Sequence, residues 1–128
     1  MALRRLDHVL VLTDDLEATR GFYCDVLGLR VGDRPGVPFA GYWLYADDTL
    51  VVHLADRSDY AAFAPQLGLE AADAPVDHLA FQADDYDDLA RRVAAADLDA
   101  TSNTVPGLMR QLFVFDPNGV RIELNVSE

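Results

Sequence analysis

The stretch "LDHVLVLTDDLEATRGF", Leu6–Phe22, decides the fold, because "VDHLAFQADDYDDLARRV", Val76–Val93, follows the same plan later in the chain. Each stretch has Asp-His, an apolar run suited to a strand, an Asp-Asp pair and then a helical pattern. His78 follows His8 by 70 residues, and the two Asp-Asp pairs have the same spacing. The shared spacing indicates that two similar structural units follow one another.

The same spacing continues to the end of each half. "LYADDTLVVHL" aligns without a gap on the stretch "FVFDPNGVRIEL", so that His53 and Glu123 occupy equivalent positions. Two independent matches at one spacing indicate an internal duplication.

Each half predicts a strand, a helix and three further strands, and so an α+β fold of two tandem βαβββ modules in one domain. We expect the first module over about 5–57, a linker with a short helical piece over 58–75, and the second module over about 76–127. Asp47–Asp48 and the "DPNG" run at 116–119 predict the hairpin turns of the two modules.

Composition and charge limit the classes of partner. The net charge of −12 disfavours nucleic acid and anionic membranes, because both require a basic surface. The single cysteine excludes an internal disulfide and is typical of a reducing compartment. With no apolar span and no signal peptide, we expect a cytoplasmic protein that acts on a small molecule.

The three histidines and one glutamate share a strand face. Because strand side chains alternate, the apolar residues of each strand form one continuous face, which we expect the helices to cover. The other face, expected to lie away from the helix-packed core, carries His8, His53, His78 and Glu123, with Gln82, Arg121 and Asn125 alongside. A lone histidine in a strand is usually a hydrogen-bonded core residue, but a carboxylate buried beside three imidazoles favours a divalent metal ion. Arg121 is a rival partner for the carboxylate.

The stretches "DHV", "DLEATRGFYCDVLGL", "VVHL", "DHLAF" and "FDPNGVRIEL" resemble the vicinal oxygen chelate superfamily, which includes glyoxalase I, methylmalonyl-CoA epimerase, ring-cleaving dioxygenases and bleomycin-resistance proteins. The resemblance implies paired modules whose mixed sheet forms a cup around one metal ion, with Ni, Co, Zn, Mn and Fe as candidates. It also implies that His8, His53, His78 and Glu123 are the metal ligands. His53 stands where glyoxalase I has a glutamate and the epimerase a glutamine.

Three activities follow from this resemblance. The first is a glyoxalase I-like lyase or isomerase, in which Glu123 or His53 moves a proton next to a carbonyl. Glutathione fits poorly as co-substrate, because Leu12 and Arg57 replace the family's arginine and asparagine. The second is a ring-cleaving dioxygenase, although Phe113 replaces the family's tyrosine. The third is a metal-free drug- or metabolite-binding protein.

The same strands supply candidates for substrate binding, and the resemblance suggests a homodimer. Whether the four metal ligands come from one chain or from two remains open at this stage. The candidate substrate-binding residues are Gln82, Arg121, Trp43, Tyr45 and Phe113.

Overall fold

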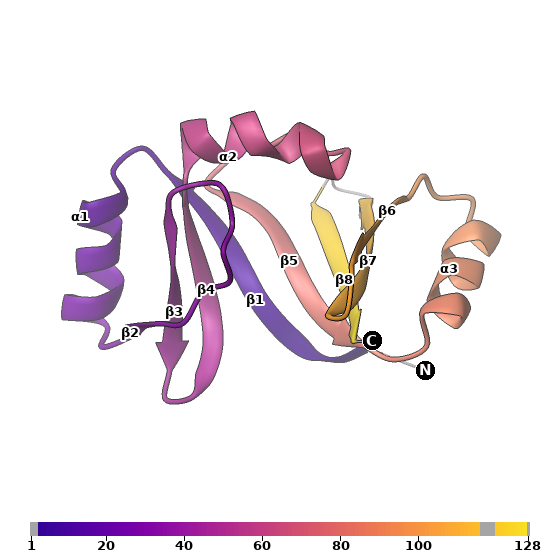
Figure 1. The fold of residues 1–128 in the computed structure, drawn as a ribbon, viewed down its shortest axis with the longest axis horizontal. Helices are drawn as coiled ribbons and strands as arrows, with labels where there is room; N and C mark the ends of the chain where they lie inside the picture. The colour runs from indigo at the N-terminus through magenta and orange to yellow at the C-terminus, as the bar shows by residue number, and fades with distance from the viewer. Residues whose placement is uncertain (1–2, 116–119, 128) are drawn as a thin grey trace. The chain divides into compact units, whose positions relative to one another are not determined.

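The computed structural model describes residues 3–115 and 120–127. The chain divides into two compact units, an N-terminal unit of His8–Asp77 and a C-terminal unit of Met1–Asp7 with His78–Glu128. Figure 1 labels the helices and strands of both. The predicted "DPNG" turn lies outside the described residues.

The N-terminal unit has the predicted order of one strand, one helix and three strands. A helical segment from Arg57 to Leu67, in the predicted linker, then follows. The elements are β1 (Leu3–Thr13, which begins in the C-terminal unit), α1 (Leu16–Gly21), a π-helical turn (Phe22–Val26), β2 (Arg30–Gly32), β3 (Gly41–Ala46), β4 (Thr49–Asp56), α2 (Arg57–Phe63) and a 3₁₀ turn (Ala64–Leu67). The strand order is β2-β3-β4-β1, with β1 parallel to β4 and the other pairs antiparallel.

The C-terminal unit repeats this arrangement. Its elements are β5 (Val76–Ala83, which begins in the N-terminal unit), α3 (Tyr86–Ala95), β6 (Thr101–Val105), β7 (Met109–Phe115) and β8 (Arg121–Ser127). The strand order is β5-β8-β7-β6, with β5 parallel to β8. The predicted α+β class with two βαβββ modules is therefore confirmed.

The strand register confirms the internal duplication. Leu10 of β1 pairs with His53 of β4, and Ala80 of β5 pairs with Glu123 of β8, so both partners shift by the same 70 residues. The first and fourth strands of each module are thus parallel neighbours, and side chains from the two strands reach one face.

The equivalent helices of the two modules, α1 and α3, each begin at an aspartate that follows a strand. The side chain of Asp15 accepts a hydrogen bond from the Ala18 N–H, and Asp85 accepts one from the Asp88 N–H. Each carboxylate satisfies a backbone donor that the first turn of a helix leaves unpaired, which stabilises the helix start. Gly28 follows the π-helical turn with φ of 82°, a conformation that glycine adopts without steric cost.

The apolar face of the C-terminal unit is covered by a helix, as predicted. Leu89 of α3 packs with Ala83, Leu112 and Leu124, and several half-buried apolar side chains surround this cluster. In the N-terminal unit, Tyr42 of β3 donates a hydrogen bond of 2.5 Å to Glu17 of α1. Figure 1 shows α1 alongside β3 and β4.

The opposite face of the N-terminal unit corrects our prediction. We expected the face that carries His8 and His53 to lie away from the helix-packed core. However, Leu10 and Leu12 of this face pack against Tyr60 of α2 in one buried cluster. The helix from the linker therefore covers one end of the histidine face. The cluster also contains Phe39, Ala55 and Ala64.

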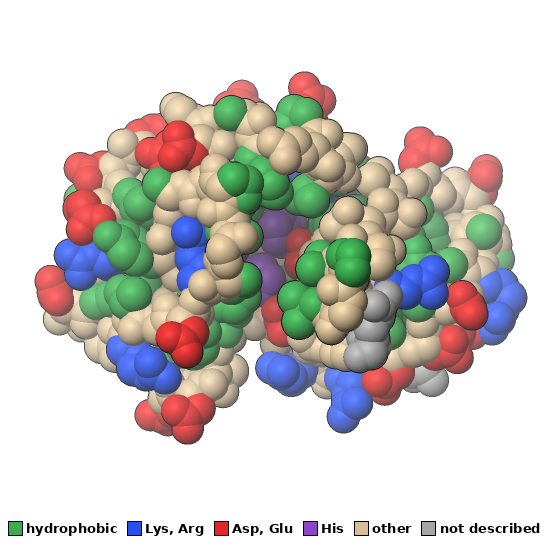
Figure 2. Space-filling view, viewed as in Figure 1, with side chains coloured by type: hydrophobic (Ala, Val, Ile, Leu, Met, Phe, Trp, Pro, Cys, Tyr) green, Lys and Arg blue, Asp and Glu red, His purple; other side chains and the backbone are tan. Residues whose placement is uncertain are grey.

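Acidic side chains (red) are spread over the face of the molecule drawn in Figure 2, on which histidine atoms (purple) are also visible. None of the helices among the described residues is long and apolar enough to cross a membrane.

Candidate metal centre

The four predicted metal ligands are all buried. The exposed fractions are 8% for His8, 7% for His53, 5% for His78 and 7% for Glu123. His8, His78 and Glu123 each offer one atom that a metal ion can bind. Because water does not solvate these groups, their polar atoms need partners from the protein or from a bound ion.

His8 and His53 lie near one another in the N-terminal unit, together with two aromatic side chains. The His8 and His53 ring centroids are 6.0 Å apart. Trp43, directly opposite His53 in the β3–β4 pair, has its ring centroid 5.5 Å from that of His53 and 6.5 Å from that of His8. Phe39 stacks on His53 at 5.6 Å with an angle of 25° between the rings. The imidazoles are thus held by aromatic packing.

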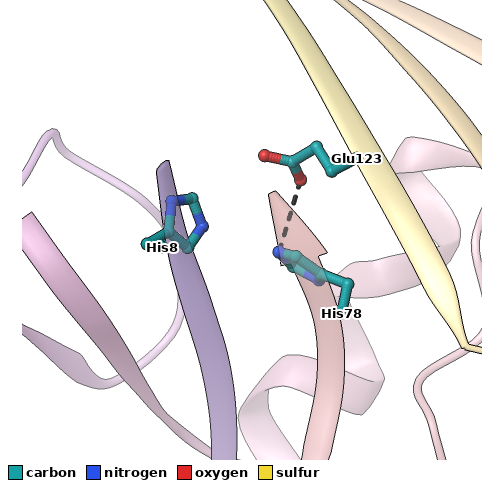
Figure 3. Close-up of side chains that lie close together, drawn as sticks. All are labelled: His8, His78 and Glu123. Atoms are coloured by element: carbon teal, nitrogen blue, oxygen red, sulfur yellow. Dashed lines mark ion pairs between the residues drawn. The ribbon is translucent and has the colours of Figure 1, made fainter. Parts of the chain in front are cut away.

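His78 and Glu123 form the corresponding pair in the C-terminal unit. Nε2 of His78 lies 3.4 Å from Oε1 of Glu123, the contact drawn as a dashed line in Figure 3. His78 comes from β5 and Glu123 from β8, which are parallel neighbours. A neutral imidazole and a carboxylate at this separation are suitable donors for a divalent metal ion.

A chain of amide side chains orients Glu123. The amide nitrogen of Asn125 donates to Oε2 of Glu123 at 2.8 Å, and Asn125 itself accepts from Gln111 at 3.2 Å. Gln111 in turn accepts from Asn103 at 2.8 Å. The chain therefore binds one carboxylate oxygen, while Oε1, the other, faces His78. Sequence reasoning placed Asn125 on this face but missed Gln111 and Asn103, which the register pairs with it across β6, β7 and β8.

The predicted substrate-binding residues occupy different surroundings. Trp43 lies next to the imidazoles, and Phe113 is buried opposite Glu123 in the β7–β8 pair. Arg121 is buried, with its guanidinium carbon 5.3 Å from the Phe115 ring centroid. Glu123 contacts His78 and Asn125, whereas Arg121, the rival partner that we considered, lies against the Phe115 ring.

Gln82 and Tyr45 have their polar groups engaged elsewhere. The amide nitrogen of Gln82 donates to Oδ1 of Asp7 at 2.8 Å, and the Tyr45 hydroxyl donates to the Asp33 carbonyl at 2.6 Å. Gln82 also lines an open cavity of about 400 Å³ in the C-terminal unit. Substrate binding by these two residues stays a prediction.

One arginine on the N-terminal unit was not anticipated from the sequence. Arg34 lies between β2 and β3, donates from Nη2 to the Phe39 carbonyl at 2.6 Å and lies with its guanidinium carbon 5.0 Å from the Phe39 ring centroid. Burial lowers the pKa of the Arg34 guanidinium from its usual value. No sequence motif marks Arg34, because its position depends on how the β2–β3 connection folds back.

Comparison with known proteins identifies the family. The family model described as Glyoxalase/Bleomycin resistance protein/Dioxygenase superfamily matches residues 5–124. The chain belongs to this superfamily. The Escherichia coli protein YaeR, described as uncharacterized, is 24% identical over 97% of both chains.

Two solved structures have a similar fold. Methylmalonyl-CoA epimerase from Mycobacterium tuberculosis aligns with a TM-score of 0.70 and 23% identity, covering 98% of this chain and 89% of the epimerase. The Mn(II)-bound glyoxalase from Novosphingobium aromaticivorans aligns with a TM-score of 0.64 and 24% identity, covering 98% of this chain and 40% of the glyoxalase. At these identities, the likeness establishes a glyoxalase-like fold.

Proposed function

We propose that this superfamily member is a divalent-metal-dependent lyase or isomerase that moves a proton next to a carbonyl group of a small chelating substrate. His8, His53, His78 and Glu123 are the proposed metal ligands. The observation that carries the proposal is the buried His78–Glu123 pair, in which an amide donor binds one carboxylate oxygen while the other faces the imidazole. A glyoxalase-like reaction is therefore our leading assignment.

The donor set fits a divalent metal ion. Imidazole nitrogen and carboxylate oxygen together are typical ligands of Zn, Ni, Co, Mn and Fe sites. A buried carboxylate such as Glu123 costs several kcal/mol unless a positive charge or hydrogen-bond donors compensate it. With three neutral imidazoles and one carboxylate, the bound ion keeps a net positive charge, which suits an anionic intermediate.

Glu123 is the proposed general base. A bound metal ion supplies Lewis-acid chemistry that polarises the carbonyl group. The Asn125 amide fixes Oε2 of Glu123, so that Oε1 is the oxygen directed to accept the proton. His53 is an alternative base, and the rings of Trp43 and Phe39 beside it exclude water from that side.

A ring-cleaving dioxygenase is the second candidate. Two histidines and one carboxylate are the ligand set of many Fe(II) oxygenases, and His8, His78 and Glu123 match it in chemical type. The side chain opposite Glu123 is Phe113. At this position, where the family resemblance expects a tyrosine, phenylalanine cannot donate or accept a proton.

The cellular setting that we propose follows from composition. A net charge of −12 and a single cysteine favour a cytoplasmic protein that binds a small molecule and does not bind nucleic acid or membranes. We also propose a homodimer, on the basis of the family resemblance.

Elemental analysis of the purified, tag-free protein is the first test. We expect nearly one equivalent of metal in the wild type, and none in H78A or E123Q. E17Q is the matched control, because it makes the same chemical change at an exposed glutamate of α1. E17Q is expected to retain the metal content of the wild type.

Two measurements separate the candidate activities. One identifies the bound metal, and the other follows the consumption of oxygen. Ni or Co, with no oxygen uptake, supports the lyase or isomerase. Fe or Mn, together with oxygen uptake on catechols, supports the dioxygenase. Absence of metal from the wild type, even after reloading with each ion, contradicts both enzymes and leaves a metal-free binding protein.

A further inference from the structure

Two buried N–H donors in the N-terminal unit have no hydrogen-bond acceptor among the residues that the structure describes. They are Nε of Arg34 and Nε1 of Trp43. Most buried donors in proteins are paired, so two unpaired donors in one small unit require an explanation. A ligand that brings its own acceptors is one such explanation.

Both donors belong to the face that carries the imidazoles. Trp43 pairs with His53 across β3 and β4. Gly41 precedes Trp43 by two residues on the same face, and a Cβ built on Gly41 would lie 3.0 Å from Nη2 of Arg34. The Arg34 guanidinium therefore lies close to Gly41, at the start of β3.

Phe39 connects this guanidinium to the candidate metal centre. Its ring centroid lies 5.0 Å from the guanidinium carbon of Arg34 and 5.6 Å from the ring centroid of His53. Arg34 is thus one aromatic ring away from a proposed metal ligand.

The charge of Arg34 is not compensated by a carboxylate among the described residues. This is unusual in a chain with 22 acidic and 10 basic residues. In the same unit, Arg20, Arg30 and Arg57 pair with Glu17, Asp48 and Asp14. A half-buried cation without an acidic partner favours the binding of an anion.

We propose that Arg34 and Trp43 bind the carboxylate group of a small organic acid, with Phe39 as the apolar side of the subsite. Both side chains offer only donors, and the planar guanidinium matches the two oxygens of a carboxylate. The substrate class is then a carboxylic acid that carries a further chelating oxygen. The assignment to a substrate rests on the proposed function, whereas the carboxylate subsite itself does not.

Calorimetric titration of metal-free protein with malonate tests this subsite without the metal. We expect malonate to bind the wild type and to bind R34Q at least about tenfold more weakly, because a charge-assisted hydrogen bond is lost. W43F, which keeps an aromatic ring but loses the N–H, is expected to weaken binding as well. Dimethyl malonate, the neutral ester, is expected not to bind.

R30Q is the matched control for R34Q. It removes the same charge from an exposed arginine that is already paired with Asp48, so malonate affinity is expected to stay within about twofold of wild type. Thermal unfolding of each variant checks that it is folded, and W43F provides a second test if R34Q is not.

Three results would overturn the carboxylate subsite. The first is that the wild type does not bind malonate. The second is that R34Q binds malonate with the same affinity as the wild type. The third is that R34Q and R30Q lose malonate affinity to the same extent. Metal content measured on the same preparations separates this proposal from the proposed function. If the protein binds malonate through Arg34 but never takes up metal, the proposed metal centre is rejected and the carboxylate subsite is retained.

Discussion

At the scale of single residues, the orientation of Glu123 depends on Asn125. Asn125 is 3% exposed and donates to one carboxylate oxygen. A group that orients a metal ligand strengthens metal binding, because a carboxylate that is already held in place loses less rotational freedom when it binds the ion. The sequence placed Asn125 on the correct face, but only the folded sheet shows which carboxylate oxygen it holds.

We therefore predict that N125A weakens metal binding by about 10- to 100-fold without abolishing it. Chelator competition on the purified variant measures the affinity. N103A, at the far end of the same amide chain, serves as the control and is expected to have a smaller effect. Wild-type affinity in N125A would contradict the orienting role of the amide.

The contact between Tyr42 and Glu17 predicts a pH effect at one residue. The hydrogen bond from Tyr42 lowers the pKa of Glu17 and raises the pKa of Tyr42. Because the pKa of Glu17 is lower in the folded protein, its contribution to stability is present above its unfolded pKa and is lost as the pH falls through the folded pKa.

We expect Y42F to raise the pKa of Glu17 towards its usual value, and E17Q to lower that of Tyr42. Carboxyl chemical shifts in an NMR titration and the ultraviolet absorbance of tyrosine measure the two effects. If neither pKa changes, the hydrogen bond does not form in solution.

At the scale of elements, the two modules use equivalent aspartates to begin their helices. Asp85 precedes α3 with φ of 56°, a left-handed conformation that Asp and Asn tolerate better than most residues. The spacing of Asp15 and Asp85 was predictable from the sequence, because capping is local chemistry. The covering of the histidine face by α2 was not, since strand alternation carries no information about where a linker helix packs.

D85A is predicted to reduce the free energy of unfolding by about 1–2 kcal/mol, through loss of the cap and strain at the left-handed position. D85N, which retains both properties, is expected to change it by less than about 0.5 kcal/mol. Urea denaturation measures both values. D84A is the control, because it removes a neighbouring surface charge but no cap. If D84A lowers the free energy of unfolding as much as D85A does, the effect of D85A does not come from capping.

At the scale of the whole molecule, one chain carries both modules and all four proposed ligands. We expect the proposed homodimer to have a mass of about twice 14.1 kDa in sedimentation analysis. A concentration-independent mass equal to one chain would contradict it.

Mixing two defective variants tests whether one chain supplies the complete ligand set. H53A and E123Q are unfolded together, refolded together and then analysed for metal. No recovery of metal would show that each site takes all its ligands from one chain. Recovery of metal would show that ligands from two chains combine in one site.

The sequence by itself determined the two βαβββ modules, their 70-residue spacing, the Asp-Asp pairs before the two helices and the strand positions of His8, His53, His78 and Glu123. These features follow from local rules of alternation, capping and turn formation. Only the tertiary structure decided that α2 packs on the histidine face, that Asn125 binds one oxygen of Glu123, and that Arg34 lies close to Gly41. Such contacts join residues distant in the chain, and packing rather than periodicity selects them.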